Sequence, residues 1–239
     1  MIFAAGKGTR LKPLTDNIPK ALIKVKGMPL LEHVIKHLKQ FGVNEIIINV
    51  HYLAEQIKYF LKTKNYFNVQ FHISDESDLL LDTGGGLKNA ATFFNTHENF
   101  IVYNVDVLSD IDLNEMMNEH IKNGNLATLA VRNRHSNRYL LFDDELQLCG
   151  WENTKTSQKI ISRMGYNMLK PFAFSGIHLI NSDIFGLITE EGVFSMTEVY
   201  IRLAKNYKIK AYLHQNSQWY DIGKHDTLIE ADKYYKISY

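Results

Sequence analysis

A glycine-rich loop with two basic side chains follows the first apolar run of the chain. It reads Ala4-Ala5-Gly6-Lys7-Gly8-Thr9-Arg10-Leu11. Glycines let the backbone approach a ligand, and free N–H groups in such a loop suit phosphate oxygens. Lys7 and Arg10 add positive charge, and a guanidinium can bind phosphate in a bidentate way. The segment lacks the Gly-Lys-Ser/Thr of a Walker loop and the full dinucleotide pattern. It therefore indicates either a phosphate-binding loop or a surface turn with two incidental basic residues.

A carboxylate stands just beyond a second apolar run, which ends at Asn104. Asp106 would lie past the carboxyl end of that strand, where a carboxylate can bind Mg²⁺. The alternative is an N-cap for the following helix, but Asp110 and Asp112 are better placed for that role. Asp106 is therefore a candidate metal ligand.

Three successive glycines, Gly84, Gly85 and Gly86, follow Thr83 and precede a predicted helix. Such a run is costly to order without a reason, because glycine loses more conformational freedom on folding than any other residue. The run could let a base, a ribose or a sugar lie against the backbone. The alternative interpretation is a flexible entry to the helix.

The composition is that of an ordinary globular protein. The chain has 239 residues, a net charge of +1, 45% hydrophobic residues and 22% charged residues. These values exclude a mainly disordered chain and argue against a general binder of nucleic acids or membrane surfaces. The single cysteine, Cys149, permits no intrachain disulfide, and we expect a buried, inert thiol. No apolar run approaches the roughly 20 residues of a membrane span, and no signal peptide is evident, so we expect a cytoplasmic protein.

Strand-like and helix-like segments alternate in the first half of the chain. The predicted strands are Met1–Ala5, Glu45–Val50, Val69–Ile73 and Phe100–Asn104. The predicted helices are Leu30–Phe41, Leu53–Lys62 and Leu113–Lys122, the first of them stopped by Gly42. This alternation predicts an α/β fold with a doubly wound, mostly parallel sheet, in which ligands bind beyond the carboxyl ends of the strands.

The pattern changes after residue 126. The predicted strands are Ala127–Arg132, Tyr139–Phe142, Leu146–Trp151, Pro171–Ile180 and Lys210–Leu213. The predicted helices are Thr197–Asn206 and His225–Tyr235, and the polar stretch between Asn153 and Lys170 reads as a flexible excursion. We interpret the chain as one domain, 1–239, whose second half (126–239) adds a small lobe and the closing helix. The cluster Arg132, Arg134, His135 and Arg138 reads as a solvated basic loop.

The opening loop is followed by Pro13-Leu14-Thr15 and by Pro19-Lys20. With these elements in order, the sequence resembles the sugar-1-phosphate nucleotidyltransferases. The resemblance runs from Met1 to about Asp110 and again from Phe174 to Gly223. It implies a mixed, Rossmann-like sheet of the glycosyltransferase-A-like nucleotidyltransferase fold with a small sugar-binding lobe. The nucleotide-binding half would then be 1–125, and the sugar-binding half with the closing helix would be 126–239. The same resemblance implies a reaction in which a sugar 1-phosphate attacks the α-phosphorus of a nucleoside triphosphate and pyrophosphate leaves.

The resemblance also implies roles for individual residues. Late in the chain, Trp219-Tyr220-Asp221-Ile222-Gly223 resembles the segment that carries the second metal ligand. Catalytic roles fall on Arg10, Lys20 and Asp106, and Mg²⁺ binding on Asp106 and Asp221. Nucleotide binding falls on Ala4, Ala5, Gly6, Lys7, Gly8, Thr9, Arg10, Lys20, Thr83, Gly84 and Asn104. Sugar binding falls on Gly85, Gly86, Gly176 and Glu198. Val105 departs from the family pattern, because glycine is common at that place.

Within the family, Thr83-Gly84-Gly85-Gly86 resembles bacterial N-acetylmuramate-1-phosphate uridylyltransferases. This implies UTP and N-acetylmuramate 1-phosphate as substrates, a role in recycling cell-wall peptidoglycan, no nucleic-acid or membrane partner, and a monomer or small homo-oligomer. The alternatives are a guanylyltransferase for mannose or heptose 1-phosphate, a phosphocholine cytidylyltransferase, and a non-catalytic nucleotide-sugar sensor. A nicotinamide-dependent dehydrogenase is disfavoured, because no acidic residue ends the strand at Val50.

Overall fold

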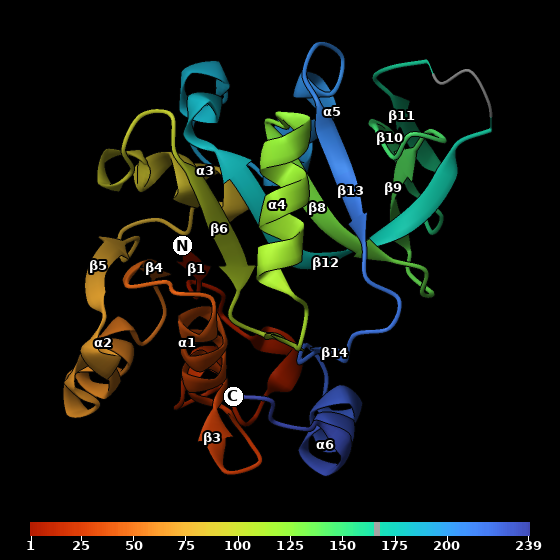
Figure 1. Cartoon of the computed structure of the whole chain (residues 1–239). Helices are drawn as coiled ribbons and strands as arrows, with labels where there is room; N and C mark the ends of the chain where they lie inside the picture. The colour runs from red at the N-terminus through yellow and green to blue at the C-terminus, as the bar shows by residue number, and fades with distance from the viewer. Residues whose placement is uncertain (165–167) are drawn as a thin grey trace. The chain divides into compact units, whose positions relative to one another are not determined.

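The computed structural model describes residues 1–164 and 168–239, which form two compact units. Unit 1 comprises Met1–Leu81, Tyr103–Ile111 and Ser217–Tyr239, and unit 2 comprises Asp82–Val102 and Asp112–Asn216. Each unit contains helices and strands, so the predicted α/β class is confirmed (Figure 1). Among the described residues, no helix combines the length and apolar character that a membrane crossing requires.

The sheet of unit 1 is parallel. Its strands are β1 (Ile2–Phe3), β4 (Glu45–Val50) and β5 (Gln70–Asp75), joined by the last two residues of β6 (Asn99–Asn104). The predicted strands are confirmed, with small shifts at their ends. Phe3 lies opposite Asn49 on one side and Asn104 on the other. The carboxyl ends of these strands therefore meet at the edge where Ala4 begins the glycine-rich loop.

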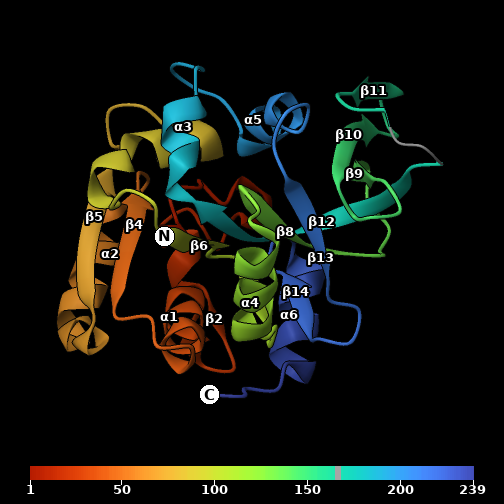
Figure 2. The ribbon, with the colours of Figure 1, turned by 45° about the horizontal axis from the view of Figure 1, so that its top comes forward.

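Two helices of unit 1 confirm the predicted periodicity. They are α1 (Leu30–Gln40) and α2 (Ala54–Thr63), which Figure 2 shows along the strands of this unit. The predicted face of α1, Leu31, Val34, Ile35 and Leu38, is buried, at no more than 2% exposure. The helix ends at Gln40, and Gly42 follows two residues later with a φ of 77°, which suits glycine just beyond a helix C-terminus.

Short strands that the sequence analysis did not identify complete unit 1. They are β2 (Lys24–Val25), β3 (Met28–Pro29), β7 (Val107–Ser109) and β14 (Trp219–Asp221). The first two form a hairpin, and the last two pair antiparallel. The closing helix α6 (His225–Tyr234) lies against them through a buried apolar cluster that includes Val25, Leu108, Ile222 and Tyr235. This cluster holds the β7–β14 ladder in place.

Unit 2 is mostly antiparallel in its strand pairing. Its helices are α3 (Asp82–Asn89), α4 (Leu113–Asn123) and α5 (Met196–Leu203). Its strands are β8 (Ala127–Arg132), β9 (Arg138–Phe142), β10 (Leu148–Asn153), β11 (Gln158–Ile161), β12 (Lys170–Asn181) and β13 (Ile209–Leu213). Only β13 with β8 is a parallel pair among the registers described within this unit.

The interpretation of residues 153–170 as a flexible excursion is wrong for its first part. Strand β11 pairs antiparallel with β10, and Gln158 lies opposite Asn153. A Cβ atom at Gly150 would lie 2.3 Å from the Ile160 carbonyl oxygen, so the close approach of the two strands requires glycine there. All four residues of β11 are exposed, and its sequence Gln-Lys-Ile-Ile does not alternate between apolar and polar residues, so it gave no strand signal. Residues 165–167 lie outside the described part of the chain.

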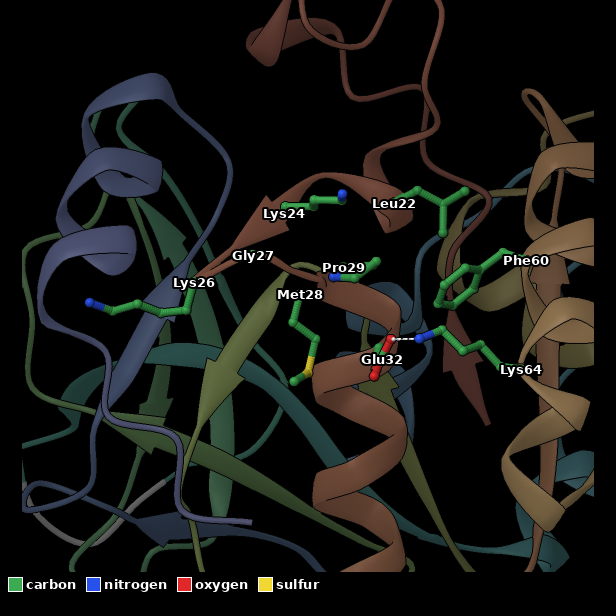
Figure 3. A pocket seen from close by; sticks show the side chains of 9 residues that line it. All are labelled: Leu22, Lys24, Lys26, Gly27, Met28, Pro29, Glu32, Phe60 and Lys64. Atoms are coloured by element: carbon green, nitrogen blue, oxygen red, sulfur yellow. Dashed lines mark ion pairs between the residues drawn. The ribbon is translucent and has the colours of Figure 1, made fainter.

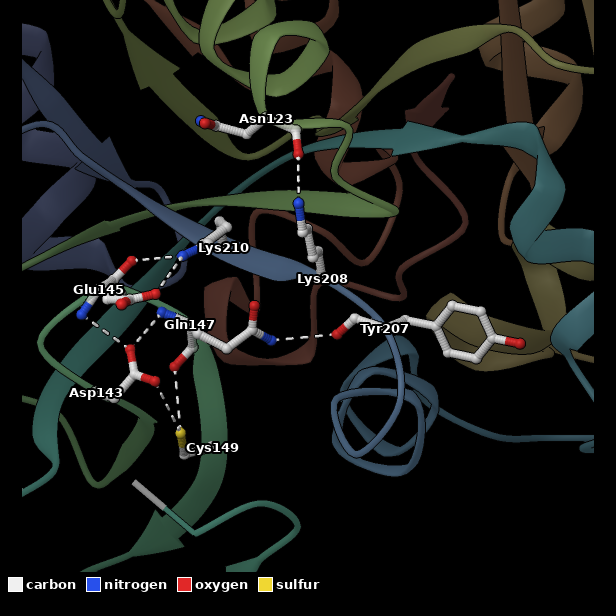
Figure 4. A network of polar contacts seen from close by, with 8 residues as sticks. All are labelled: Asn123, Asp143, Glu145, Gln147, Cys149, Tyr207, Lys208 and Lys210. Carbon is white, nitrogen blue, oxygen red and sulfur yellow. Dashed lines mark hydrogen bonds and ion pairs between the residues drawn. The ribbon is translucent and has the colours of Figure 1, made fainter. Parts of the chain in front are cut away.

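The cysteine lies in a polar network of unit 2, drawn in Figure 4. Cys149 is buried, with Sγ 3.4 Å from the Gln147 carbonyl oxygen. Nearby, the Asp143 carboxylate accepts hydrogen bonds from the N–H groups of Glu145 and Gln147. Burial raises the pKa of the Cys149 thiol, which disfavours the reactive thiolate. This agrees with the expected inert thiol.

Candidate functional site

The glycine-rich loop of unit 1 is tied to the residues that follow it. Gly8 has a φ of 62°, and a Cβ atom there would lie 2.9 Å from Thr15 Cγ2 and 3.1 Å from Lys20 Cβ. The Thr15 hydroxyl donates a hydrogen bond of 2.8 Å to the Gly8 carbonyl oxygen. Only glycine fits this contact without strain. Direct packing of Gly8 against Thr15 and Lys20 therefore fixes the distance between the loop and Lys20.

The remaining loop residues are available to a ligand. Gly6, Lys7, Thr9 and Arg10 are exposed, whereas Leu11 is buried and anchors the loop to the unit. The backbone forms a short 3₁₀ turn over Thr9–Leu11. The cationic side chains of Lys7 and Arg10 and the exposed backbone of Gly6 therefore lie at the carboxyl end of β1, as a phosphate site requires.

An ion pair joins Lys20 to Asp106. Lys20 lies in a second 3₁₀ turn, Lys20–Leu22, and its Nζ contacts Asp106 Oδ2. The Lys20 side chain is 10% exposed and that of Asp106 is 22% exposed. Removing a charge from water is costly unless an opposite charge compensates it. The Lys20 ammonium and the Asp106 carboxylate therefore stabilise each other in their partly buried positions. Two predicted catalytic residues, 86 positions apart, are thus adjacent.

The second predicted metal ligand is close to Asp106 through the β7–β14 ladder. Asp221 lies opposite Val107, and the Ile222 N–H donates a hydrogen bond of 2.8 Å to the Asp106 carbonyl oxygen. At the end of β14, a Cβ atom on Gly223 would lie 2.8 Å from Arg10 Nη2 and 2.9 Å from Asp221 Oδ1. Gly223 therefore leaves room for a guanidinium and a carboxylate, and each predicted metal ligand has a cationic side chain nearby.

The residues of this region fit a divalent cation of the Mg²⁺ type. Among residues 1–164 and 168–239 no group of three or more His, Cys, Asp or Glu side chains could hold a metal ion. Mg²⁺ does not need such a cage, because it commonly binds one or two carboxylates together with waters and substrate phosphates. Asp106 and Asp221 would supply two hard oxygen ligands to such an ion. The buried Asn104 Oδ1 has no hydrogen-bond partner among the described residues and leaves one more acceptor at this edge.

Ala4 and Ala5 are buried at the start of the loop. The Ala4 N–H donates a hydrogen bond of 2.7 Å to Asn49 Oδ1, so it is already used within the protein. The Asn49 amide in turn donates to Glu76, a buried carboxylate after β5. Neither Asn49 nor Glu76 was among the residues predicted from the sequence. The only signal was an asparagine inside the apolar run Glu45–Val50.

In unit 2, the glycine run lies within a helix. The prediction that it precedes the helix is wrong, because α3 begins at Asp82. The N–H groups of Gly84 and Gly85 donate to the Phe194 carbonyl oxygen at 2.9 and 3.2 Å. A Cβ atom at Gly84 would lie 2.4 Å from the Phe194 ring. The Thr83 hydroxyl accepts a hydrogen bond from the Met196 N–H. Packing thus accounts for Gly84 and Thr83, and their role toward a ligand stays a prediction.

The other sugar-binding candidates also lie in unit 2. Gly176 has a φ of 79° and stands where the register of β12 against β8 shifts. Glu198 lies in the first turn of α5, which Ser195 caps: the Glu198 N–H donates to Ser195 Oγ, and the Ser195 hydroxyl donates to Glu198 Oε1. In the basic segment, Arg134 donates to the Phe174 carbonyl oxygen. None of these contacts identifies a ligand.

A separate pocket of about 490 Å³ lies in unit 1 between the β2–β3 hairpin and the facing ends of α1 and α2 (Figure 3). At its edge Glu32 forms an ion pair of 3.1 Å with Lys64. It is lined by none of the predicted site residues.

The comparison with protein families identifies the chain. The model of the family described as nucleotidyl transferase matches residues 1–237. The chain belongs to the nucleotidyl transferase family. The likeness of a solved structure, HddC from Yersinia pseudotuberculosis, supports the same fold, with a TM-score of 0.78, 23% identity and coverage of 98% of each chain. The predicted mixed α/β nucleotidyltransferase fold is thereby confirmed.

Two curated relatives show the range of the family. The bifunctional protein GlmU of Methanocaldococcus jannaschii is 30% identical over 240 residues, which cover 98% of this chain and 53% of the relative. The N-acetylmuramate alpha-1-phosphate uridylyltransferase of Neisseria meningitidis serogroup B is 42% identical over 112 residues, 47% of this chain and 48% of the relative. The matched part of each relative is therefore about half of its length.

Proposed function

We propose that this member of the nucleotidyl transferase family joins a nucleoside triphosphate to a sugar 1-phosphate and releases pyrophosphate. The observation that carries the proposal is the Lys20–Asp106 ion pair beside the glycine-rich loop, with Asp221 on the neighbouring strand. Such a reaction brings two anionic substrates together, so it needs fixed cations and metal-binding carboxylates. Unit 1 supplies both kinds of group.

The sugar 1-phosphate brings its own nucleophile, so no activated serine or cysteine is required. One oxygen of its phosphate attacks the α-phosphorus, and the bond from that phosphorus to the pyrophosphate oxygen breaks. The loop N–H groups from Gly6 to Thr9 and the Arg10 guanidinium bind the triphosphate. The Lys20 ammonium offsets the charge that builds up around the α-phosphorus. A Mg²⁺ ion held by Asp106 and Asp221 would supply further charge neutralisation there.

We propose UTP and N-acetylmuramate 1-phosphate as the substrates, which would place the product in cell-wall metabolism. The Thr83–Gly86 run, which resembles that of the muramate enzymes, supports this choice. The relative from Neisseria meningitidis, which carries that activity in its name, adds support over the part of the chain that it matches. The choice of base and sugar depends on the predicted binding residues of unit 2.

A pyrophosphate-release panel tests the proposal. UTP, GTP, CTP and dTTP are each combined with N-acetylmuramate, mannose, heptose and glucose 1-phosphates and with phosphocholine, in the presence of Mg²⁺. We expect the highest kcat/KM for UTP with N-acetylmuramate 1-phosphate. Turnover only with GTP or CTP would overturn the substrate assignment and leave the reaction class intact. Nucleotide-sugar binding without turnover of any pair would indicate a sensor and contradict the enzymatic proposal.

A further inference from the structure

A buried carboxylate stands at the centre of a hydrogen-bond chain in unit 1. Glu76 is 3% exposed and directly follows β5. Its Oε1 accepts a hydrogen bond of 2.7 Å from the Asn49 side-chain amide, and its Oε2 accepts one of 3.1 Å from the Leu81 N–H. No lysine or arginine among the described residues forms an ion pair with it. Burying a carboxylate that only hydrogen bonds stabilise costs desolvation free energy. Such a residue therefore suggests a role beyond packing.

The direction of this chain fixes the orientation of Asn49. Both carboxylate oxygens of Glu76 can only accept, so Asn49 must turn its NH₂ group toward Glu76. Its Oδ1 then faces the Ala4 N–H, which donates to it at 2.7 Å. The opposite orientation of the amide would set donor against donor at Ala4. Asn49 is itself only 3% exposed, so water cannot easily replace either bond.

Ala4 is the residue at which the backbone leaves β1 and enters the glycine-rich loop. Binding its N–H to Asn49 sets the direction in which the next N–H groups, from Ala5 to Gly8, are presented. The backbone N–H of Glu76 also donates to the Val50 carbonyl oxygen at 2.8 Å. Glu76 therefore connects the loop to the ends of two further strands, β4 and β5.

We propose that Glu76 and Asn49 are a positioning pair that holds the glycine-rich loop ready for the triphosphate. The inference rests on the proposed function, because it takes the loop as the triphosphate site. Neither side chain needs to touch the substrates. The pair instead removes the loop's freedom to rotate at Ala4 before binding, which strengthens binding without adding a contact.

A polarity swap tests the pair. Glu76→Gln alone sets an NH₂ group against either the Asn49 NH₂ or the Leu81 N–H, and Asn49→Asp alone sets two carboxylates against each other. The double variant restores every bond. The Leu81 N–H donates to the new amide oxygen at position 76, the new NH₂ group there donates to the new carboxylate at position 49, and that carboxylate accepts from the Ala4 N–H. Its net charge equals that of the wild type. Asn95→Asp, at an exposed Asn95–Glu98 hydrogen bond of 2.8 Å, is the matched control.

The first readout is the affinity for the triphosphate, measured by calorimetry with each of the four Mg²⁺–nucleotide complexes, together with both KM values. Each single variant should bind the preferred nucleotide at least about tenfold more weakly, with the KM for the sugar phosphate changed by less than about twofold. The double variant should return to within about threefold of the wild type, and Asn95→Asp should match the wild type. Folded single variants with wild-type affinity, or a double variant no better than the singles, would overturn the proposal.

The second readout needs no ligand and separates this inference from the proposed function. Hydrogen exchange of the peptide that covers Ala4–Leu11 should be faster in both single variants and return to the wild-type rate in the double variant. Unchanged exchange in the singles would overturn the positioning role. If the wild type binds none of the four nucleotides, the proposed function fails while this readout still tests the pair. If the singles do not fold, the double variant must fold and regain protection, and its failure would contradict the proposal.

Discussion

In unit 1, predicted site residues from distant segments of the chain lie next to one another. In unit 2, the predicted site residues instead make contacts that stabilise the fold of the unit. Lys20 pairs with Asp106, and Gly223 leaves room for Arg10 beside Asp221. In unit 2, by contrast, the Gly84 N–H donates to the Phe194 carbonyl oxygen, and the Glu198 side chain accepts from the Ser195 hydroxyl that caps the same helix. A motif is therefore a stronger indication of ligand binding where internal packing does not already explain its residues.

The buried titratable groups sharpen the same contrast. Unit 1 has the Lys20–Asp106 ion pair beside the loop. Buried histidines occur in both units: burial lowers the pKa of His33 in unit 1, and in unit 2 it lowers that of His178 to about 3 and that of His120 to about 4. The charged groups beside the loop therefore distinguish unit 1, whereas neutral buried rings occur in both units.

The largest expected effect separates chemistry from stability. Asp106→Asn should lower kcat by at least about a thousandfold, or roughly 4 kcal/mol, because it removes a carboxylate that compensates Lys20 and suits Mg²⁺. Asp112→Ala is the matched change, since Asp112 caps α4 by accepting from the N–H groups of Asn114 and Glu115. It should cost about 1 kcal/mol of stability and leave kcat unchanged. Steady-state kinetics and urea unfolding measure both, and wild-type turnover by Asp106→Asn would contradict the metal assignment.

The second effect tests whether packing explains the glycine run of unit 2. Gly84→Ala places a methyl group 2.4 Å from the Phe194 ring and 2.9 Å from the Phe194 carbonyl oxygen. We expect a loss of about 3 kcal/mol in the free energy of unfolding. Gly186→Ala is the control, because no other described atom lies within 4 Å of a Cβ atom there. Equal stabilities of the two variants in denaturant titrations would refute the packing explanation.

The third effect concerns the neutral histidines. His120 hydrogen-bonds to Thr128 Oγ1 and Asn99 Oδ1, and its pKa of about 4 lies below the ordinary value of 6.5. The unfolded chain therefore binds the proton more readily, so stability is lost as the pH falls from about 6.5 toward 4. Between pH 7.5 and 5 the wild type should lose about 2 kcal/mol more than His120→Gln. Parallel losses in unfolding experiments at the two pH values would contradict the lowered pKa.

The smallest effect isolates the ligand from the fold. No other described atom lies within 4 Å of a Cβ atom built on Gly6, and Gly6 does not have a positive φ. Gly6→Ala should therefore leave the melting temperature unchanged. It should raise the KM for the triphosphate by about tenfold, because the methyl group stands where phosphates approach the backbone. A stable variant with an unchanged KM would place the triphosphate elsewhere.

The sequence predicted those parts of the molecule that rest on local patterns. Periodicity found α1 and β4, and the motif around Lys20 and Asp106 predicted the ion-paired residues. Strands β7 and β14 have three residues each, too few for any alternation, although they bring Asp221 to Asp106. Glu76 was missed because it lies in a polar stretch where acidic residues are normally solvated. Its burial follows only from the pairing of β4 with β5.

The most direct test of the account compares two lysines of unit 1. Lys20 is buried against Asp106, whereas Lys24, four residues later, is exposed. Single-turnover pyrophosphate release with saturating substrates should slow by at least about a hundredfold in Lys20→Met and by less than about twofold in Lys24→Met. Equal rates in the two variants, or a change in Lys20→Met confined to KM, would contradict the role of Lys20 at the reacting phosphorus.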